Sequence, residues 1–256
     1  MKTVILCGGR GFRLQEETEY RPKPLVPIGG KPILWHILQM YASFGHREFI
    51  LCLGYRGDMI KEYFANYDML NCDCTVELGK KGAIVHENEH TEQGYRITLA
   101  DTGLETMTGG RIKRIERYLN EDTFMLTYGD GVSDVHIDDL LAYHYSHKKC
   151  ATVTVVHPFS HYGVLSVHND GRVLQFAEKP MENHWISAGF FVFSKKVFDY
   201  LEGDGCVLEN KPLKRLAVEG ELMAYKHKGI FYSMDTYRDY ILLNDLWNRG
   251  NVAWIK

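Results

Sequence analysis

The chain has 256 residues, of which 45% are hydrophobic and 25% charged, and these are the proportions of a globular protein. Lys and Arg number 30 against 33 Asp and Glu, and this net charge of −3 argues against nonspecific nucleic-acid binding. No stretch approaches the roughly 20 apolar residues that cross a bilayer, and the apolar run before Gly8 is too short for a signal peptide. We therefore expect a cytoplasmic protein that binds neither nucleic acid nor membranes.

The first half of the chain alternates between apolar strands and helices. Apolar residues recur at helical spacing in the helical segments, whereas the strands are short and continuously apolar. Strands are expected at 3–7, 48–53 and 123–127, and helices at 32–44, 57–67 and 137–147. Buried strands separated by helices form a largely parallel sheet that is covered on both faces. The pattern therefore predicts an α/β fold.

The second half is richer in strands. They are expected at 151–156, 163–167, 173–177 and 186–193, and helices return at 209–219 and 237–248. Asn169-Asp170-Gly171 supplies the turn residues of a β-hairpin. The sequence contains no internal repeat, low-complexity tract or linker. It therefore predicts one domain over residues 1–256, with a β-rich elaboration after about residue 150.

The cysteines and histidines do not form the pattern of a metal site or a disulfide framework. Three of the six cysteines lie in or beside apolar segments, where a reduced thiol packs as a small hydrophobic group: Cys7, Cys52 and Cys150. Cys72 and Cys74 have no second pair at zinc-finger spacing. His144 and His147 are three residues apart on a predicted helix, and we expect both to be solvated.

The most informative segment is a glycine-rich loop directly after the first strand. Gly8, Gly9 and Gly11 let the backbone approach a ligand closely and turn several N–H groups towards an anion. In α/β sheets this carboxyl end of a strand is where ligands bind. The dinucleotide-binding fingerprint fails because Leu14 stands where its third glycine belongs, and the P-loop pattern fails as well. A dinucleotide-dependent oxidoreductase is therefore not expected.

Two cations follow the glycines. Arg13 lies in the loop itself, and Lys23 is flanked by Pro22 and Pro24. The prolines stiffen the backbone, so that the Lys23 ammonium can be held against a phosphate. The alternative is a tight turn with solvated basic residues.

Two aspartates follow apolar strands and are candidate metal ligands. Asp130 lies between Gly129 and Gly131, and Asp235 follows the segment 230–234. Two carboxylates at strand ends suit Mg²⁺, which takes one or two protein carboxylates together with phosphate oxygens and water. Taken alone, such an aspartate is more often a turn residue or a helix N-cap.

These residues together resemble a known signature. Gly8-Gly9-x-Gly11-x-Arg13-Leu14 followed by Lys23-Pro24 is the signature of the sugar-phosphate nucleotidyltransferases, and further matching blocks extend to about residue 254. The segments 107–111 (Met-Thr-Gly-Gly-Arg) and 234–236 (Met-Asp-Thr) single out the glucose-1-phosphate cytidylyltransferase family. This resemblance implies a Rossmann-like three-layer nucleotidyltransferase fold with a predominantly parallel, mixed sheet. It also implies a nucleotide-binding half (about 1–150), an acceptor-binding half (about 151–256) and a homo-oligomer.

The resemblance also implies the reaction. A phosphate oxygen of a sugar 1-phosphate (glucose 1-phosphate by resemblance) would attack the α-phosphorus of CTP, with Mg²⁺ as cofactor, and pyrophosphate would leave. Because the nucleophile is already anionic, catalysis would consist mainly of positioning and charge neutralisation. The products would be a CDP-sugar and pyrophosphate.

The roles of individual residues come from the resemblance alone. The residues implied in catalysis are Arg13, Lys23, Asp130 and Asp235, of which the two aspartates would also hold the metal. The implied nucleotide contacts are Leu6, Gly8, Gly9, Gly11, Phe12, Arg13, Lys23, Thr106, Arg111, Gly129 and Asp130, with Arg111 in the region of the base. The implied acceptor contacts are Tyr128, His161, Tyr162, Gly163, Glu178, Lys179, Ser187, Ala188, Gly189 and Asp235. Glu178-Lys179-Pro180 could instead be a charged strand exit.

Four positions depart from the family pattern, and most of them fall in the acceptor region. Phe12 stands where the family has Thr, and His161 stands where it has Arg. Ser187 replaces an Asn and Ser233 replaces a Gln. A buried sugar hydroxyl left unpaired costs about 1–3 kcal/mol, which is enough to change the preferred acceptor. The acceptor could therefore be a different sugar phosphate or a non-sugar phosphate or phosphonate, or the changes could be neutral drift.

Two other classes of protein compete with this interpretation. A nucleotide-sugar glycosyltransferase would favour an Asp-x-Asp motif, which the segment 130–134 does not supply. A non-catalytic nucleotide-binding regulator would need Phe12 to block productive binding of the triphosphate. The presence of all four candidate catalytic residues and of Lys179 counts against the regulator.

Overall fold

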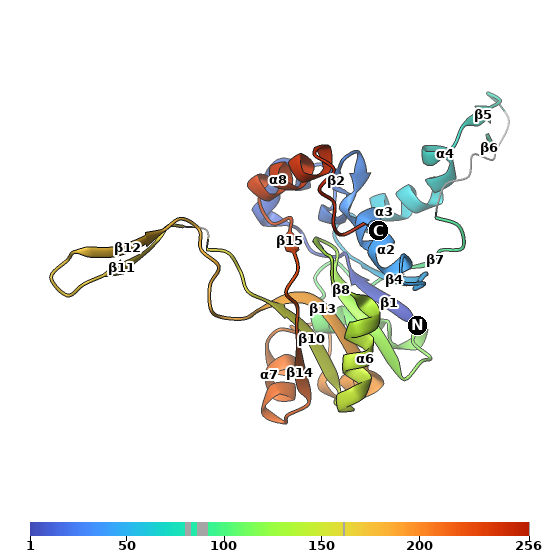
Figure 1. Cartoon of the computed structure of the whole chain (residues 1–256). Helices are drawn as coiled ribbons and strands as arrows, with labels where there is room; N and C mark the ends of the chain where they lie inside the picture. The colour runs from blue at the N-terminus through green and yellow to red at the C-terminus, as the bar shows by residue number, and fades with distance from the viewer. Residues whose placement is uncertain (80–82, 86–91, 161, 256) are drawn as a thin grey trace.

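The computed structural model describes residues 1–79, 83–85, 92–160 and 162–255. Its centre is a seven-stranded sheet in the order β14-β10-β13-β8-β1-β4-β7 (Figure 1). The strands are β1 (Lys2–Leu6), β4 (Glu48–Leu53), β7 (Arg96–Asp101), β8 (Thr123–Tyr128), β10 (Ala151–Val156), β13 (Ile186–Ser194) and β14 (Leu222–Lys226). Only β13 is antiparallel to its neighbours within this sheet. The predicted mixed, mostly parallel α/β fold is confirmed.

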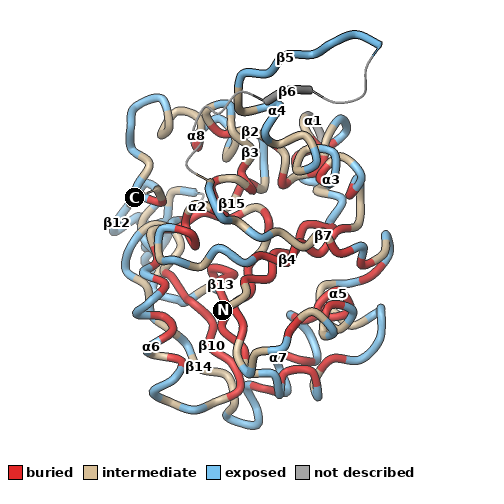
Figure 2. Tube along the Cα trace, turned by 90° about the vertical axis from the view of Figure 1, so that its right-hand side faces the viewer, coloured by how far each residue is buried: buried red, intermediate tan, exposed pale blue. Residues whose placement is uncertain are grey.

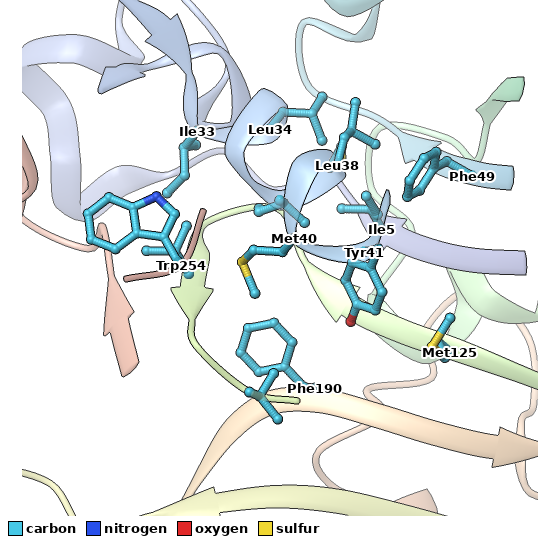
Figure 3. Packing of buried hydrophobic residues seen from close by; sticks show 14 of the residues in the cluster. Ile5, Ile33, Leu34, Leu38, Met40, Tyr41, Phe49, Met125, Phe190 and Trp254 are labelled. Carbon is cyan, nitrogen blue, oxygen red and sulfur yellow. The ribbon is translucent and has the colours of Figure 1, made fainter. Parts of the chain in front are cut away.

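Helices cover both faces of the sheet, because successive side chains of a strand point to opposite faces. Ile5 packs with α2 (Ile33–Ala42), α6 (Ile137–His147) and α8 (Tyr237–Asn248). Figure 3 shows this cluster around Ile5, Met125 and Tyr41. Val4, the neighbour of Ile5, packs on the other face with α5 (Thr108–Arg114) and α7 (Lys211–Val218). The buried segments of Figure 2 accordingly lie at the centre of the molecule.

A β-hairpin stands away from this body. Its strands are β11 (Val164–Val167) and β12 (Val173–Ala177), and Figure 1 shows them far from the central sheet. The predicted turn is confirmed: the His168 amide donates to the carbonyl of Arg172 at 2.8 Å, and Gly171 has φ +89°. Every residue of β11 is exposed.

Smaller ladders and helices complete the chain. The short sheets pair β9 (Gly131–Ser133) with β15 (Phe231–Ser233), β2 (Pro27–Ile28) with β3 (Lys31–Pro32), and β5 (Cys74–Val76) with β6 (Ala83–Val85). The remaining α-helices are α1 (Gln15–Thr18), α3 (Gly57–Ala65) and α4 (Tyr67–Asn71). No helix of the described residues is long and apolar enough to cross a membrane.

Most of the predicted elements are confirmed, and β4, α6, β10, β12 and α8 have the predicted bounds. The pattern does not predict α5, because Gly109 and Gly110 are poor helix formers. A Cβ at Gly109 would lie 2.7 Å from the sulfur of Cys206, and one at Gly110 would lie 2.7 Å from the carbonyl oxygen of Asp204. Close packing against this neighbouring loop therefore selects glycine at both positions.

The predicted solvation of the α6 histidines is wrong. His144 is buried, and its Nδ1 lies 2.8 Å from the hydroxyl of Thr152 on β10. Nε2 of His147 lies 2.7 Å from the same hydroxyl. This helix face is turned towards the sheet, and burial lowers the pKa of His144 to about 4. The predicted packing of Cys7, Cys52 and Cys150 as buried thiols is confirmed.

Candidate active site

A cavity of about 640 Å³ lies at the carboxyl ends of β1 and β8. Its walls are the glycine-rich loop, the segment 104–108 and the start of the turn after β8. Every residue for which the resemblance implies a nucleotide contact lines this cavity. The fold therefore brings together residues that lie more than a hundred positions apart in the chain.

A different feature of the structure explains the glycine at each of the three positions of the loop. A Cβ on Gly8 would lie 2.2 Å from Cζ of Arg111, so Gly8 makes room for a side chain of the protein. Gly11 has φ +65°, which favours glycine. A Cβ on Gly9 would meet no atom within 4 Å, so at this position the loop is open to a ligand.

Arg111 is buried beneath the cavity, and its described hydrogen bonds go to the protein. Nη1 donates to the carbonyls of Leu53 and Gly103 at 2.9 and 2.7 Å and to the hydroxyl of Thr102 at 2.9 Å. Nη2 donates to the carbonyls of Gly8 and Leu104 at 3.1 and 3.3 Å. This guanidinium therefore joins the glycine-rich loop, the end of β4 and the segment after β7. Burial lowers its pKa from the usual range.

The four candidate catalytic residues meet at one edge of the cavity. Lys23 Nζ donates to Oδ2 of Asp130 at 2.7 Å and to Oδ1 of Asp235 at 2.8 Å. Nη2 of Arg13 lies 3.3 Å from the same Asp235 oxygen. The Lys23 side chain is 12% exposed, whereas that of Arg13 is 77% exposed.

The charges in this cluster set the protonation of its members. Burial opposes the charge of Lys23, but the Asp130 and Asp235 carboxylates outweigh burial and raise the pKa of the ammonium. Burial also raises the pKa of Asp235, yet the hydrogen bond from Lys23 and the charges of Lys23 and Arg13 lower it overall. Lys23 is therefore held charged, and Asp235 is held ionised.

The Asp130 and Asp235 carboxylates, which share the Lys23 ammonium, are also suitable ligands for a divalent metal. Among the described residues no group of three or more His, Cys, Asp or Glu side chains forms a complete protein cage. Mg²⁺ takes one or two carboxylates and completes its shell with phosphate oxygens and water. Asp130 and Asp235 fit that donor set at the edge of a cavity that is open to a phosphate.

Apart from Asp235, the implied acceptor residues that the structure describes lie in two groups, and of these only Tyr128 lines the cavity. The first group surrounds Tyr128, whose hydroxyl donates to the carboxylate of Glu209. Gly189 has φ +76°, and a Cβ there would lie 2.5 Å from Cδ2 of Tyr128. The hydroxyl of Ser187 accepts the amide of Gly189 at 3.2 Å. The neighbouring Ala188 is buried.

The second group lies at the base of the hairpin. Lys179 Nζ is 3.3 Å from Oε1 of Glu178, and both side chains are substantially exposed. Lys179 has φ 45°, an uncommon conformation for a residue with a Cβ. Tyr162 is 78% exposed, and Gly163 packs against the hairpin. His161 lies outside the described residues. The described residues of this group therefore lie outside the lining of the nucleotide cavity.

Sequence reasoning missed a bridge across the cavity. Arg10 of the glycine-rich loop forms an ion pair with Glu105 of the opposite wall. Both residues line the cavity, as do Met107 and Thr108. The pair joins residues 95 positions apart, and no motif in the sequence marks it.

Comparison with known proteins identifies the family. The family model described as nucleotidyl transferase matches residues 2–236. The chain belongs to this family. It is 45% identical to glucose-1-phosphate cytidylyltransferase of Salmonella typhimurium (strain LT2), over 99% of this chain and 98% of that protein. It is also 44% identical to a probable glucose-1-phosphate cytidylyltransferase of Bacillus subtilis, over 99% of each chain.

Solved structures show that the family fold is shared. The structure of HddC from Yersinia pseudotuberculosis complexed with GMP-PN has a TM-score of 0.71 at 22% identity, covering 96% of this chain and 99% of that chain. UDP-glucose pyrophosphorylase complexed with UDP-glucose has a TM-score of 0.69 at 15% identity, covering 97% and 98%. These structures confirm the predicted Rossmann-like fold, and the family model and the relatives confirm the predicted resemblance and the enzyme class.

Phe12 can now be placed within this nucleotidyltransferase. Its side chain is 71% exposed, although the residue lines the cavity. The loop therefore presents an apolar ring at the surface of the cavity, where the family pattern has Thr.

Proposed function

We propose that this nucleotidyltransferase transfers a cytidylyl group from CTP to glucose 1-phosphate, giving CDP-glucose and pyrophosphate. The observation that carries the proposal is the contact of Lys23 with both Asp130 and Asp235 at the edge of the glycine-walled cavity. The base and the sugar are taken from the relatives that are 44–45% identical over the full chain.

The residues of the chain would act by positioning and by neutralising charge. The backbone around Gly9 borders the open part of the cavity, where its N–H groups would bind phosphate oxygens. Arg13 is exposed enough to reach the outer phosphates, and Lys23 is held charged beside the reacting phosphate. Asp130 and Asp235 would hold Mg²⁺, which neutralises phosphate charge and aligns the reacting groups. No general base is needed, because the attacking phosphate oxygen is already anionic.

Two groups would bind the acceptor. Tyr128 and the 187–189 segment lie next to the nucleotide cavity and would hold the sugar. By resemblance, Lys179 would bind the acceptor's phosphate and Glu178 a hydroxyl, although neither residue lines the cavity of its own chain in this structure. Their side chains are 44% and 62% exposed, so both are accessible for this role.

The test is pyrophosphate release with CTP, Mg²⁺ and glucose 1-phosphate, with UTP and dTTP as nucleotide controls. A panel of other sugar 1-phosphates, non-sugar phosphates and phosphonates tests the acceptor. We expect Asp130→Asn to abolish release, whereas Asp170→Asn, an exposed aspartate in the hairpin turn, leaves it unchanged. Activity on another acceptor alone would refute glucose 1-phosphate and would implicate Phe12 and Ser187. Binding of CTP without turnover on any acceptor would instead identify a regulator.

We further propose that the hairpin β11–β12 packs on a second copy of the chain. Leu165 is 48%, Val167 58%, Leu174 62% and Phe176 61% exposed, and Figure 2 shows the β12 segment at the surface. A two-stranded hairpin is marginally stable in water unless an apolar face is covered. Closed symmetric homo-oligomers are the commonest assemblies, and a partner would cover these apolar side chains.

Light scattering after size exclusion tests the assembly. We expect the double variant Leu165→Lys/Leu174→Lys to dissociate an oligomer into monomers. Val218→Lys is the control, because Val218 is 89% exposed on α7 in the body of the molecule. A monomeric wild-type protein at micromolar concentration would contradict the proposal.

A further inference from the structure

The carboxylate of Asp239, in the first turn of α8, lies directly beneath the backbone of Asp235. Its Oδ2 accepts the amide of Thr236 at 2.8 Å and the Thr236 hydroxyl at 2.8 Å. The Asp239 amide donates back to that hydroxyl at 3.3 Å. These contacts form a capping box, with Thr236 as the N-cap.

The same oxygen makes one contact that a capping box does not require. Oδ2 also accepts the amide of Asp235 at 3.1 Å. A capping box joins the N-cap to the third residue of the helix, whereas Asp235 precedes the N-cap. This bond therefore fixes the main chain of Asp235, a candidate metal ligand. It does not pair any backbone amide of helix α8 itself.

The backbone beside Asp235 is fixed on its other side as well. The Met234 amide donates to the carbonyl of Asp130 at 2.8 Å, and the adjacent ladder pairs Ser233 with Gly131. Backbone hydrogen bonds thus join the segments that carry Asp130 and Asp235. On the side of helix α8, the Asp239 carboxylate holds Asp235. Lys23 then bridges the two carboxylate groups themselves.

We infer that Asp239 is a positioning residue, which fixes Asp235 at the separation from Asp130 that binding of a metal–nucleotide complex requires. This inference rests on the proposed function and deepens it. Without the Asp239 carboxylate, Asp235 keeps its bond to Lys23 but loses a backbone anchor. Its carboxylate then samples positions that do not match a cation shared with Asp130, so metal-dependent affinity falls.

The test compares Asp239→Ala with Thr236→Ala. Both variants disrupt the capping box, but only Asp239→Ala removes the bond to the Asp235 amide. Affinity for the Mn²⁺–CTP complex is measured by calorimetry, the bound Mn²⁺ by electron paramagnetic resonance, and the Mg²⁺ dependence by pyrophosphate release. We expect Asp239→Ala to weaken Mn²⁺–CTP binding about tenfold, equivalent to about 1.4 kcal/mol, and Thr236→Ala to weaken it less than twofold. The Mg²⁺ concentration at half-maximal rate rises in parallel.

Asp239→Asn provides a conservative variant. Its amide oxygen can still accept the Asp235 amide, so we expect affinity between those of the wild type and Asp239→Ala. Equal Mn²⁺–CTP affinities of Asp239→Ala and Thr236→Ala would overturn the inference, because both would then act only through the helix. If the wild type binds Mn²⁺–CTP but transfers nothing, the proposed reaction is wrong and the ratio of affinities still decides the role of Asp239. If the wild type binds no Mn²⁺–nucleotide complex of any base, both proposals are overturned.

Discussion

Replacing Arg111 by Lys tests whether this residue acts through the fold or through the nucleotide. The guanidinium donates hydrogen bonds to five acceptors, which are the Leu53, Gly103, Gly8 and Leu104 carbonyls and the Thr102 hydroxyl. An ammonium has three donors and no planar fork, so at least two of these bonds are lost. The Leu53 and Gly8 carbonyls keep the amides of Thr102 and Tyr55 as donors, whereas the Gly103 and Leu104 carbonyls have no other described donor. A buried acceptor without a partner costs about 1–3 kcal/mol. We therefore expect the free energy of unfolding to fall by about 3 kcal/mol.

Thermal and urea unfolding measure this loss. For a chain of this length, about 3 kcal/mol corresponds to a fall in Tm of about 6–12 °C. Gly8→Ala should be similarly destabilising, because its Cβ would lie 2.2 Å from Cζ of Arg111. Gly9→Ala is the matched control, since its Cβ would meet no atom within 4 Å. We expect the stability of Gly9→Ala to stay within about 0.5 kcal/mol of the wild type.

The opposite result would refute this reasoning. If Arg111→Lys keeps the wild-type Tm but loses CTP affinity a hundredfold, Arg111 acts by contact with the nucleotide, as the family resemblance implies. If stability and affinity fall together, and Gly8→Ala reproduces both effects, the residue shapes the cavity by joining its walls. The two roles are separated because the Gly8 substitution leaves the guanidinium chemistry itself intact.

Three further predictions concern charge, pH and the acceptor. Lys23→Met should lower the rate of pyrophosphate release by about a hundredfold or more, because it removes the cation between the two carboxylates; a smaller loss would contradict the proposed charge neutralisation. Burial lowers the pKa of His36 to about 4, so the unfolded chain takes up a proton first as pH falls below about 6.5. His36 should therefore lower the free energy of unfolding by about 3 kcal/mol between pH 6.5 and 4, and urea titrations of His36→Gln should lack this contribution. Ser187→Asn should change the KM for the acceptor while leaving the KM for CTP within twofold; equal changes in both would rule out a separate acceptor role.

The central elements could be predicted because their signal is local. A short segment rich in β-branched residues such as 151–156 becomes a fully buried strand, and the spacing over 237–248 becomes a helix with the same bounds. The glycine-rich loop was recognisable for the same reason, since its residue types lie together in the sequence. Local periodicity and turn chemistry therefore carry most of the fold.

Contacts made over a long distance in sequence gave no such signal. Asp130 and Asp235 were paired by resemblance, but the physical cause is the ladder between β9 and β15, two strands of three residues each. Segments this short show no period. The burial of Arg111 is equally invisible, because a charged residue after two glycines favours a solvated position until the surrounding carbonyls are known.

The charge balance of the cavity connects these contacts to the proposed cofactor. Lys23 and Arg13 both meet Asp235, and Lys23 also meets Asp130, so two positive charges stand against two negative ones. Arg10 is likewise paired with Glu105. A triphosphate entering this cavity therefore meets cations whose charge is already balanced by carboxylates, and these side chains alone offer it little net attraction. A divalent cation that joins Asp130 and Asp235 would release Lys23 and Arg13 to face the phosphates. The same carboxylates that balance the cations would then supply the metal ligands, which is the strongest physical support for a Mg²⁺-dependent transfer.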